Sequence, residues 1–247
     1  MRRRVLVTRP QPGADATSRR LAALGFEPIV LPLTEIRALE PAALPDVASV
    51  DAVAVTSANA LRFAAQPLLA ALEPKPCFVV GSETASAARK AGLADPQAGR
   101  GDAEGLAQLV AARCGPGARV LYLCGKVRLP AFEAALARAG LAVVAVETYD
   151  TLPSGVAAGD IAAASGGRPI DAALLHSAES ARRLAALAPD VGDVLGSTRF
   201  FVLSPRIAAA LEGIDPSRIA TAGNPNEQAL LDLLRQPALT PPLFTRG

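Results

Sequence analysis

The sequence has few of the residues on which common metal and nucleophilic sites depend. Its 247 residues include no tryptophan, one histidine and three cysteines, and no two cysteines form a CxxC pair. A zinc site or a disulfide framework is therefore not expected, because both need paired ligands. The glycine-rich patterns of nucleotide-binding loops and the HExxH pattern of zinc proteases are also missing. We expect a protein that works without a metal and without a nucleotide.

Charge and hydropathy argue against two further classes. Lys+Arg number 25 and Asp+Glu 23, and no dense basic run follows Arg2–Arg4, so nucleic-acid binding, which needs clustered cations, is not expected. Mean hydropathy is +0.30, yet every apolar stretch is interrupted before the ~18 residues of a membrane span. Val5–Val7 is too short for the core of a signal peptide. We expect a cytoplasmic monomer without a membrane partner.

The single histidine limits nucleophilic chemistry. A Ser-His-Asp or Cys-His arrangement would have to use His176, which follows the apolar run 172–175. The favoured interpretation is a strand-end histidine that is hydrogen-bonded to its neighbours.

Short apolar runs alternate with Ala/Leu/Arg-rich segments at helical spacing. The runs are residues 5–7, 28–31, 52–55, 78–80, 120–123, 143–146, 172–175 and 200–203. Runs without polar alternation are typical of strands that are covered on both faces. Several of the segments between them end at a glycine, as helices commonly do. The pattern predicts an α/β fold with parallel sheets.

The two halves of the chain resemble each other. Residues 5–25 match 120–140, residues 51–57 match 171–177, and residues 78–82 match 200–204, with offsets of 115, 120 and 122. Offsets that rise steadily along the chain are expected after a duplication followed by small insertions. The sequence therefore predicts two related domains, and the repeat alone places their boundary near residue 118.

Small polar turns follow the predicted strands. They are residues 56–59, 81–84, 124–126, 176–180 and 203–205. One interpretation is that their Ser, Thr and Asn side chains only cap helices. The other is binding, because the carboxyl ends of parallel strands meet at one edge, where the N–H groups of helix starts attract anions. We expect a cleft for a ligand with several carboxylates or phosphates.

The order of the motifs resembles the uroporphyrinogen-III synthase family over nearly the whole chain. The motifs are residues 5–10, 21–25, 51–60, 80–85, 102–106, 123–128 and 146–151. The resemblance implies a lyase of tetrapyrrole biosynthesis that needs no cofactor. It closes hydroxymethylbilane, a small molecule with eight carboxylates, into uroporphyrinogen III, with loss of water and inversion of the last pyrrole ring. The alternative is a non-catalytic two-domain binding protein for a polycarboxylate ligand.

The resemblance also implies an architecture. Each of two related α/β domains has a parallel sheet flanked by helices, two segments cross between the domains, and the active site lies in the interdomain cleft. Domain 1 is then residues 1–35 with 153–247, and domain 2 is residues 36–150. These crossings replace the boundary near residue 118.

By motif position, the resemblance implies Tyr149 as the general acid that helps the hydroxyl group leave; a packed aromatic at the hinge is the alternative. The implied substrate-binding residues are Arg9, Ser57, Asn59, Ser82, Thr84, Gly125, Arg128, Ser177 and Ser204. Both arginines follow strand ends and can meet carboxylates with two hydrogen bonds, although a solvated role for Arg128 is left open. Where the family often has Gly-Pro-Thr-Thr, this chain has Leu-Ser-Pro-Arg, so whether Arg206 replaces a hydroxyl contact is open.

Overall fold

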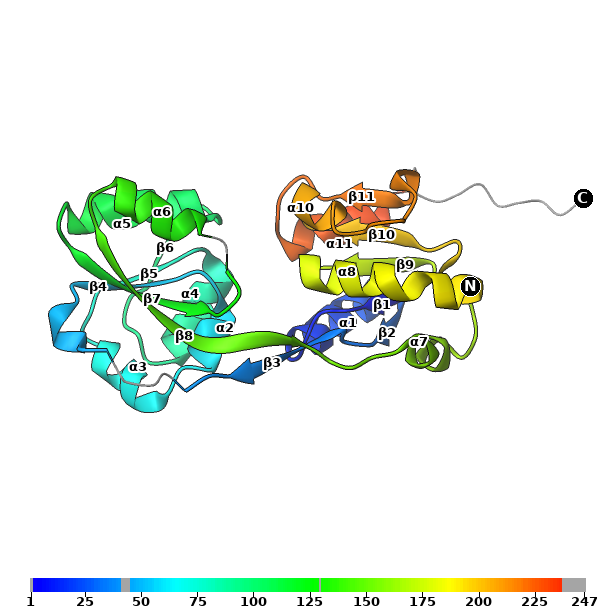
Figure 1. Ribbon diagram of the computed structural model, residues 1–247, viewed down its shortest axis with the longest axis horizontal. Helices are drawn as coiled ribbons and strands as arrows, with labels where there is room; N and C mark the ends of the chain where they lie inside the picture. The colour runs from blue at the N-terminus through cyan, green and yellow to red at the C-terminus, as the bar shows by residue number, and fades with distance from the viewer. Residues whose placement is uncertain (1, 41–44, 129, 237–247) are drawn as a thin grey trace, which may run out of the picture. The chain divides into compact units, whose positions relative to one another are not determined.

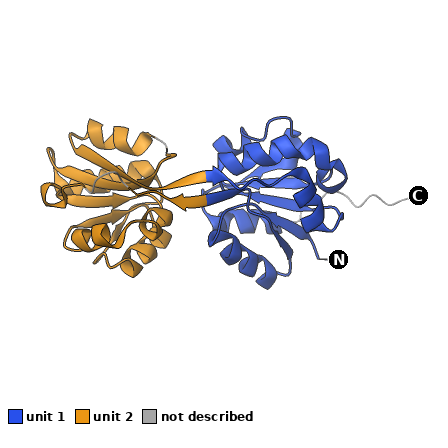
Figure 2. Cartoon of the chain, turned by 60° about the horizontal axis from the view of Figure 1, so that its bottom comes forward, with its two compact units in different colours: residues 1–35, 152–247 blue, residues 36–151 orange. Residues whose placement is uncertain are grey.

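The computed structural model describes residues 2–40, 45–128 and 130–236 (Figure 1). The chain divides into two compact units, each of which is described by itself (Figure 2). Unit 1 consists of Met1–Glu35 and Leu152–Gly247, and unit 2 is Ile36–Thr151. Two strands carry the chain across these boundaries, β3 (Thr34–Ala38) and β8 (Ala142–Pro153), and they are neighbours in one sheet.

Unit 1 is built on a parallel sheet with the strand order β11-β10-β9-β1-β2. The strands are β1 (Arg4–Val7), β2 (Glu27–Val30), β9 (Ala172–Leu175), β10 (Arg199–Val202) and β11 (Ile219–Thr221). The helices are α1 (Gly13–Ala23), α7 (Ala158–Ser165), α8 (Ala178–Leu187), α9 (Gly192–Leu195), α10 (Pro205–Ala208) and α11 (Glu227–Arg235), with short 3-10 turns at Ala188–Val191 and Pro216–Arg218.

Both faces of this sheet are buried. Leu6 and Phe200 belong to one hydrophobic cluster, whereas the adjacent Val5 and Phe201 belong to another. Successive side chains of a strand point to opposite faces, so every residue of the central strands β1 and β9 meets a core. This explains why the runs show no polar alternation.

Unit 2 contains a second sheet with the order β3-β8-β7-β4-β5-β6. Its other strands are β4 (Ala52–Val55), β5 (Cys77–Val79), β6 (Gln97–Ala98) and β7 (Arg119–Gly125), and the pairs from β8 to β6 are parallel. The helices are α2 (Ala58–Arg62), α3 (Gln66–Leu72), α4 (Ser82–Lys90), α5 (Ala103–Cys114) and α6 (Ala131–Arg138), with a 3-10 turn at Val47–Ser49. Hydrophobic clusters again cover both faces.

The two sheets share one topology. Strands β7, β8, β4, β5 and β6 take the places in unit 2 that β1, β2, β9, β10 and β11 take in unit 1. The equivalences of β1 with β7, β9 with β4 and β10 with β5 are those of the sequence repeat, so the prediction of two related α/β domains with parallel sheets and flanking helices is confirmed. In the part of the chain that the structure describes, no helix is long and apolar enough to cross a membrane.

Candidate active site

The predicted site residues lie at the carboxyl edge of the sheet in their own unit. In unit 2 the edge residues follow β4, β5 and β7, end β7 or lie late in β8: they are Ser57, Asn59, Ser82, Thr84, Gly125, Arg128 and Tyr149. In unit 1 they follow β1, β9 and β10: they are Arg9, Ser177 and Ser204. Parallel strands bring their carboxyl ends to one side, so each unit presents a polar edge.

Tyr149 lies directly against Gly125. The two residues are partners in the β7–β8 pair, after a register shift between Cys124 and Gly125. A Cβ atom at Gly125 would lie 2.6 Å from Cζ of Tyr149 and 2.9 Å from its hydroxyl oxygen. The phenol therefore occupies the space that any other residue at position 125 would fill. On another side, the ring of Phe63 lies 6.3 Å from the Tyr149 ring between centroids.

Ser57 supplies the polar contact of this phenol. Burial raises the pKa of Tyr149, and a hydrogen bond with the Ser57 side chain opposes that rise. The Ser57 hydroxyl also belongs to the start of α2. Its own oxygen accepts from the backbone N–H of Asn59 at 3.2 Å, where it caps α2. The raised pKa keeps the proton on the phenol at neutral pH.

The remaining hydroxyls and the amide of this edge belong to helix starts. The side-chain oxygen of Asn59 accepts from Arg62 at 2.9 Å. Helix α4 begins after Gly81 without a side-chain cap. The backbone N–H groups of its first turn are therefore not occupied by a capping serine or aspartate side chain. Ser82 is exposed and Thr84 is buried in the first turn of this helix.

Arg128 is held by two carboxylates. Its guanidinium contacts both oxygens of Glu133 at 3.2 Å and Oε1 of Glu147 at 2.7 Å. These two hydrogen-bonded carboxylates raise the pKa of Arg128 well above its usual value. A substrate carboxylate at this arginine would have to replace one of these partners.

Lys126 is a cation that the sequence analysis did not propose for the site. Its backbone N–H donates to the carbonyl of Tyr149 at 2.8 Å, and its side chain is 60% exposed, with Nζ 3.4 Å from Asp150. The sequence feature that could have indicated Lys126 is its position directly after Gly125, within the motif of residues 123–128.

In unit 1 the hydroxyl of Ser177 is engaged by its own helix. It accepts from the backbone N–H of Ser180 at 3.1 Å and donates to the Ser180 hydroxyl at 3.0 Å. Ser204 precedes the short helix α10 without making a side-chain cap, and Arg206 is exposed. Within unit 1, Ser204 is thus the predicted serine whose hydroxyl does not cap a helix.

Arg9 is weakly paired. Its Nη1 lies 3.4 Å from both Thr17 Oγ1 and Glu227 Oε2, whereas Glu227 makes much closer contacts with Thr17 and Arg20. The guanidinium passes over Gly13, where a Cβ would lie 2.7 Å from Cζ of the arginine.

The interpretation of His176 as hydrogen-bonded to its neighbours is wrong. Both ring nitrogens are buried, and neither has a hydrogen-bond partner among the described residues. Burial, with a smaller contribution from the charge of Arg9, lowers the pKa of His176 to about 3. The ring is therefore neutral at physiological pH. The imidazole has no partner because no side chain of the neighbouring strands makes a hydrogen bond with it. The sequence of the run 172–175 does not reveal which side chains those neighbours present.

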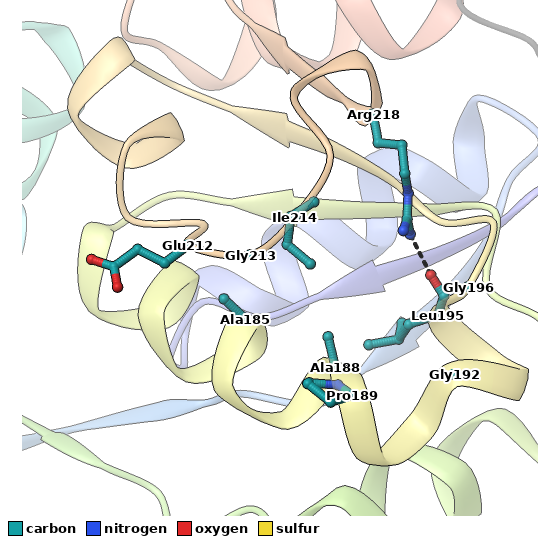
Figure 3. Close-up of a pocket in the computed structure, with 10 residues that line it drawn as sticks. All are labelled: Ala185, Ala188, Pro189, Gly192, Leu195, Gly196, Glu212, Gly213, Ile214 and Arg218. Carbon is teal, nitrogen blue, oxygen red and sulfur yellow. Dashed lines mark hydrogen bonds between the residues drawn. The ribbon is translucent and has the colours of Figure 1, made fainter.

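A pocket of about 270 Å³ lies at the other edge of the unit 1 sheet (Figure 3). It is lined by the ends of α8 and α9 and by the segments before β10 and β11. There Arg218 donates to the Leu195 carbonyl and stacks on Phe200. The site residues lie at the opposite, carboxyl edge, so this pocket is not the candidate site. No group of three or more metal-ligating side chains is found in the described residues.

Comparisons with known proteins point in one direction. The family model described as uroporphyrinogen-III synthase HemD matches residues 15–232. The structure of uroporphyrinogen-III synthetase from Helicobacter pylori is similar over 95% of this chain and 98% of that one, with 19% identity and a TM-score of 0.64. A mutant uroporphyrinogen III synthase from the extremely thermophilic bacterium Thermus thermophilus is similar over 94% and 96%, with 20% identity and a TM-score of 0.56. At these identities the structures show a shared fold. No curated protein matches the sequence.

Proposed function

Because the chain belongs to the uroporphyrinogen-III synthase family, we propose a mechanism in which its own side chains supply the chemistry of that family's reaction. The function is the cyclisation of hydroxymethylbilane to uroporphyrinogen III in tetrapyrrole biosynthesis. The proposal is that the protein acts as a lyase without a cofactor and that Tyr149 is its general acid.

Loss of water requires a proton at the departing oxygen. As the carbon–oxygen bond of the hydroxymethyl group breaks, its electron pair goes to oxygen, and the phenol of Tyr149 protonates that oxygen. The transfer is favourable because water, with a pKa of about 15.7, holds a proton more strongly than a phenol does. Once the attacked pyrrole carbon has formed the new carbon–carbon bond, that pyrrole loses a proton, which restores the phenol.

The observation that carries this role is the contact of Tyr149 with Gly125. Gly125 leaves room for the phenol at the carboxyl edge of the sheet, and burial keeps the proton on the phenol until it is transferred. A residue that served only to pack a hinge would not need an empty position opposite its hydroxyl. We therefore favour the acid over the packed aromatic.

Substrate binding is proposed to use helix starts at both carboxyl edges. The substrate carries eight carboxylates, and the uncapped amides of α4 together with the unused donors of Arg9 suit such a ligand. The location of the site in a cleft between the domains stays a prediction, as do the monomeric state, the absence of partners other than the substrate, and the cytoplasmic location.

The test is turnover of freshly prepared hydroxymethylbilane. The wild-type protein should form the III isomer, whereas the symmetrical I isomer forms without an enzyme. Tyr149→Phe should lower kcat about 10²-fold, the size expected when a general acid is removed. Tyr122→Phe is the matched control, because the chain has two tyrosines and the phenol of Tyr122 is bonded to Thr56 inside unit 2; its kcat should stay near wild type. A wild-type protein that binds the product but yields only the I isomer would support the non-catalytic binding protein instead.

A further inference from the structure

His176 and Arg9 continue a pair of neighbouring strands. In the β1–β9 pair, Val5, Leu6 and Val7 lie opposite Ala172, Ala173 and Leu174. The same register continued by two residues places Arg9 opposite His176, and the charge of Arg9 acts on the imidazole. The two side chains are therefore neighbours at the carboxyl edge of unit 1.

The equivalent position in unit 2 shows what His176 lacks. The repeat places Thr56 at the position of His176 and Tyr122 at the position of Val7. In unit 2 the Thr56 hydroxyl meets the Tyr122 hydroxyl at 2.8 Å. In unit 1 the side chain of Val7 offers no such partner, and within the described part of the chain both nitrogens of His176 stay unpaired. A buried polar group without a partner is costly, so a native protein that keeps one is expected to pair it with a group from outside the chain, such as a water, an ion or a ligand.

Arg9 is also incomplete. Of its five N–H donors, those on Nη1 make the contacts found among the described residues, and these are long, at 3.4 Å. The carboxylate that Arg9 contacts, that of Glu227, makes shorter hydrogen bonds with Thr17 and Arg20. The guanidinium also lies over Gly13, the first residue of α1, where the helix dipole disfavours a cation and favours an anion.

We propose that Arg9 and His176 form a carboxylate subsite on unit 1, in which the neutral imidazole donates its N–H to one carboxylate oxygen of the substrate and Arg9 binds the other. One anion would then supply the partner missing from His176 and a closer acceptor for Arg9 than Glu227. The ligand's identity rests on the proposed function, whereas the subsite itself rests on the unit 1 geometry.

The first test uses the fact that the chain has one histidine, so its ¹⁵N signals need no assignment by mutation. In the free protein the ring should give neutral-tautomer signals from pH 5 to 8. Saturating uroporphyrinogen III, kept reduced, should shift the donating nitrogen and slow exchange of its proton. Unchanged histidine signals at a product concentration shown by calorimetry to saturate the protein would overturn the proposal.

The second test separates binding from structure. His176→Leu removes an unpaired buried group, so Tm should rise while KM increases roughly 10- to 100-fold, the loss expected for a hydrogen bond to a charged group. His176→Gln, which keeps an N–H donor, should recover part of that loss. Thr56→Val in unit 2 is the matched control, and it should lower Tm because its hydroxyl has a partner.

An unchanged KM in His176→Leu, at any Tm, would refute the subsite. Failure of the function is distinguishable from this result: a wild-type protein that yields only the I isomer would refute the proposed reaction, whereas the histidine signals would still report whether a polycarboxylate binds at this position.

Discussion

The contact between Gly125 and Tyr149 makes an alanine at position 125 a sensitive probe of the mechanism. Gly125 does not have a positive φ, so alanine can adopt its backbone and acts only through its methyl group. That methyl group would lie 2.6 Å from Cζ of Tyr149, whereas ordinary contacts begin at 3.4 Å. The phenol must therefore move by about 1 Å, and a misplacement of this size costs about 10²-fold in rate.

The measurement is kcat for the III isomer, with Tm as a check of folding. Gly125→Ala should lose about 10²-fold in kcat, and the double variant with Tyr149→Phe should be no slower than the poorer single variant, because both changes remove one function. Gly159→Ala is the control, since nothing lies within 4 Å of a Cβ there, and its kcat should match wild type. If Gly125→Ala keeps wild-type kcat, or if the two losses multiply to ~10⁴-fold, Tyr149 does not act as proposed.

The site and its surroundings give three further predictions. Ser57→Ala, Ser82→Ala, Thr84→Ala and Ser177→Ala should each lower kcat/KM by tenfold or less, because the backbone donors of the helix starts remain; steady-state kinetics that show complete loss in any of them would contradict this. The pKa of His176 is about 3 in the folded protein and ~6.5 in the unfolded chain, so only the unfolded state gains a proton between pH 7 and 5. In urea unfolding, the free energy of unfolding of the wild type should therefore fall by about 2 kcal/mol more than that of His176→Leu over this range. Tyr122→Phe, which leaves Thr56 unpaired, should lower the free energy of unfolding by about 1 kcal/mol, and an unchanged denaturation midpoint would count against this hydrogen bond.

The central strands could be predicted because they are buried on both faces. The runs that became β1, β4, β5, β7, β9 and β10 are continuous and apolar. The strands β3, β6 and β11 were missed. β3 has the polar sequence TEIRA, β6 has two residues, and β11 has three, so none carries a pattern long enough to distinguish it from a loop. The repeat showed that the halves are related, but similarity does not tell which strands share a sheet, and the boundary near residue 118 is not where the units divide.

The residues of the site could be named from motifs, but their contacts could not. Tyr149 faces Gly125 because the register shift after Cys124 skips Thr148. Without that shift Thr148 would pair with Gly125, and a slip of one residue turns a side chain to the other face. The missing hydrogen bond of His176 likewise depends on the strand beside it. That strand has Val7 where the equivalent strand of unit 2 has Tyr122, and the sequence does not show this difference to matter until the strand order is known.

The discontinuity of unit 1 has a consequence for biosynthesis on the ribosome. Unit 2 is one continuous stretch, Ile36–Thr151, and can complete its sheet as soon as it emerges. In unit 1, by contrast, β1 stands between β2 and β9, and about 140 residues separate the end of β2 from the start of β9. At about 5–20 residues per second, the nascent β1 waits roughly 7–28 s for its second neighbour. Throughout that delay the edge of β1 that will pair with β9 has no hydrogen-bonding partner. An unpaired apolar edge is the kind of surface that chaperones shield.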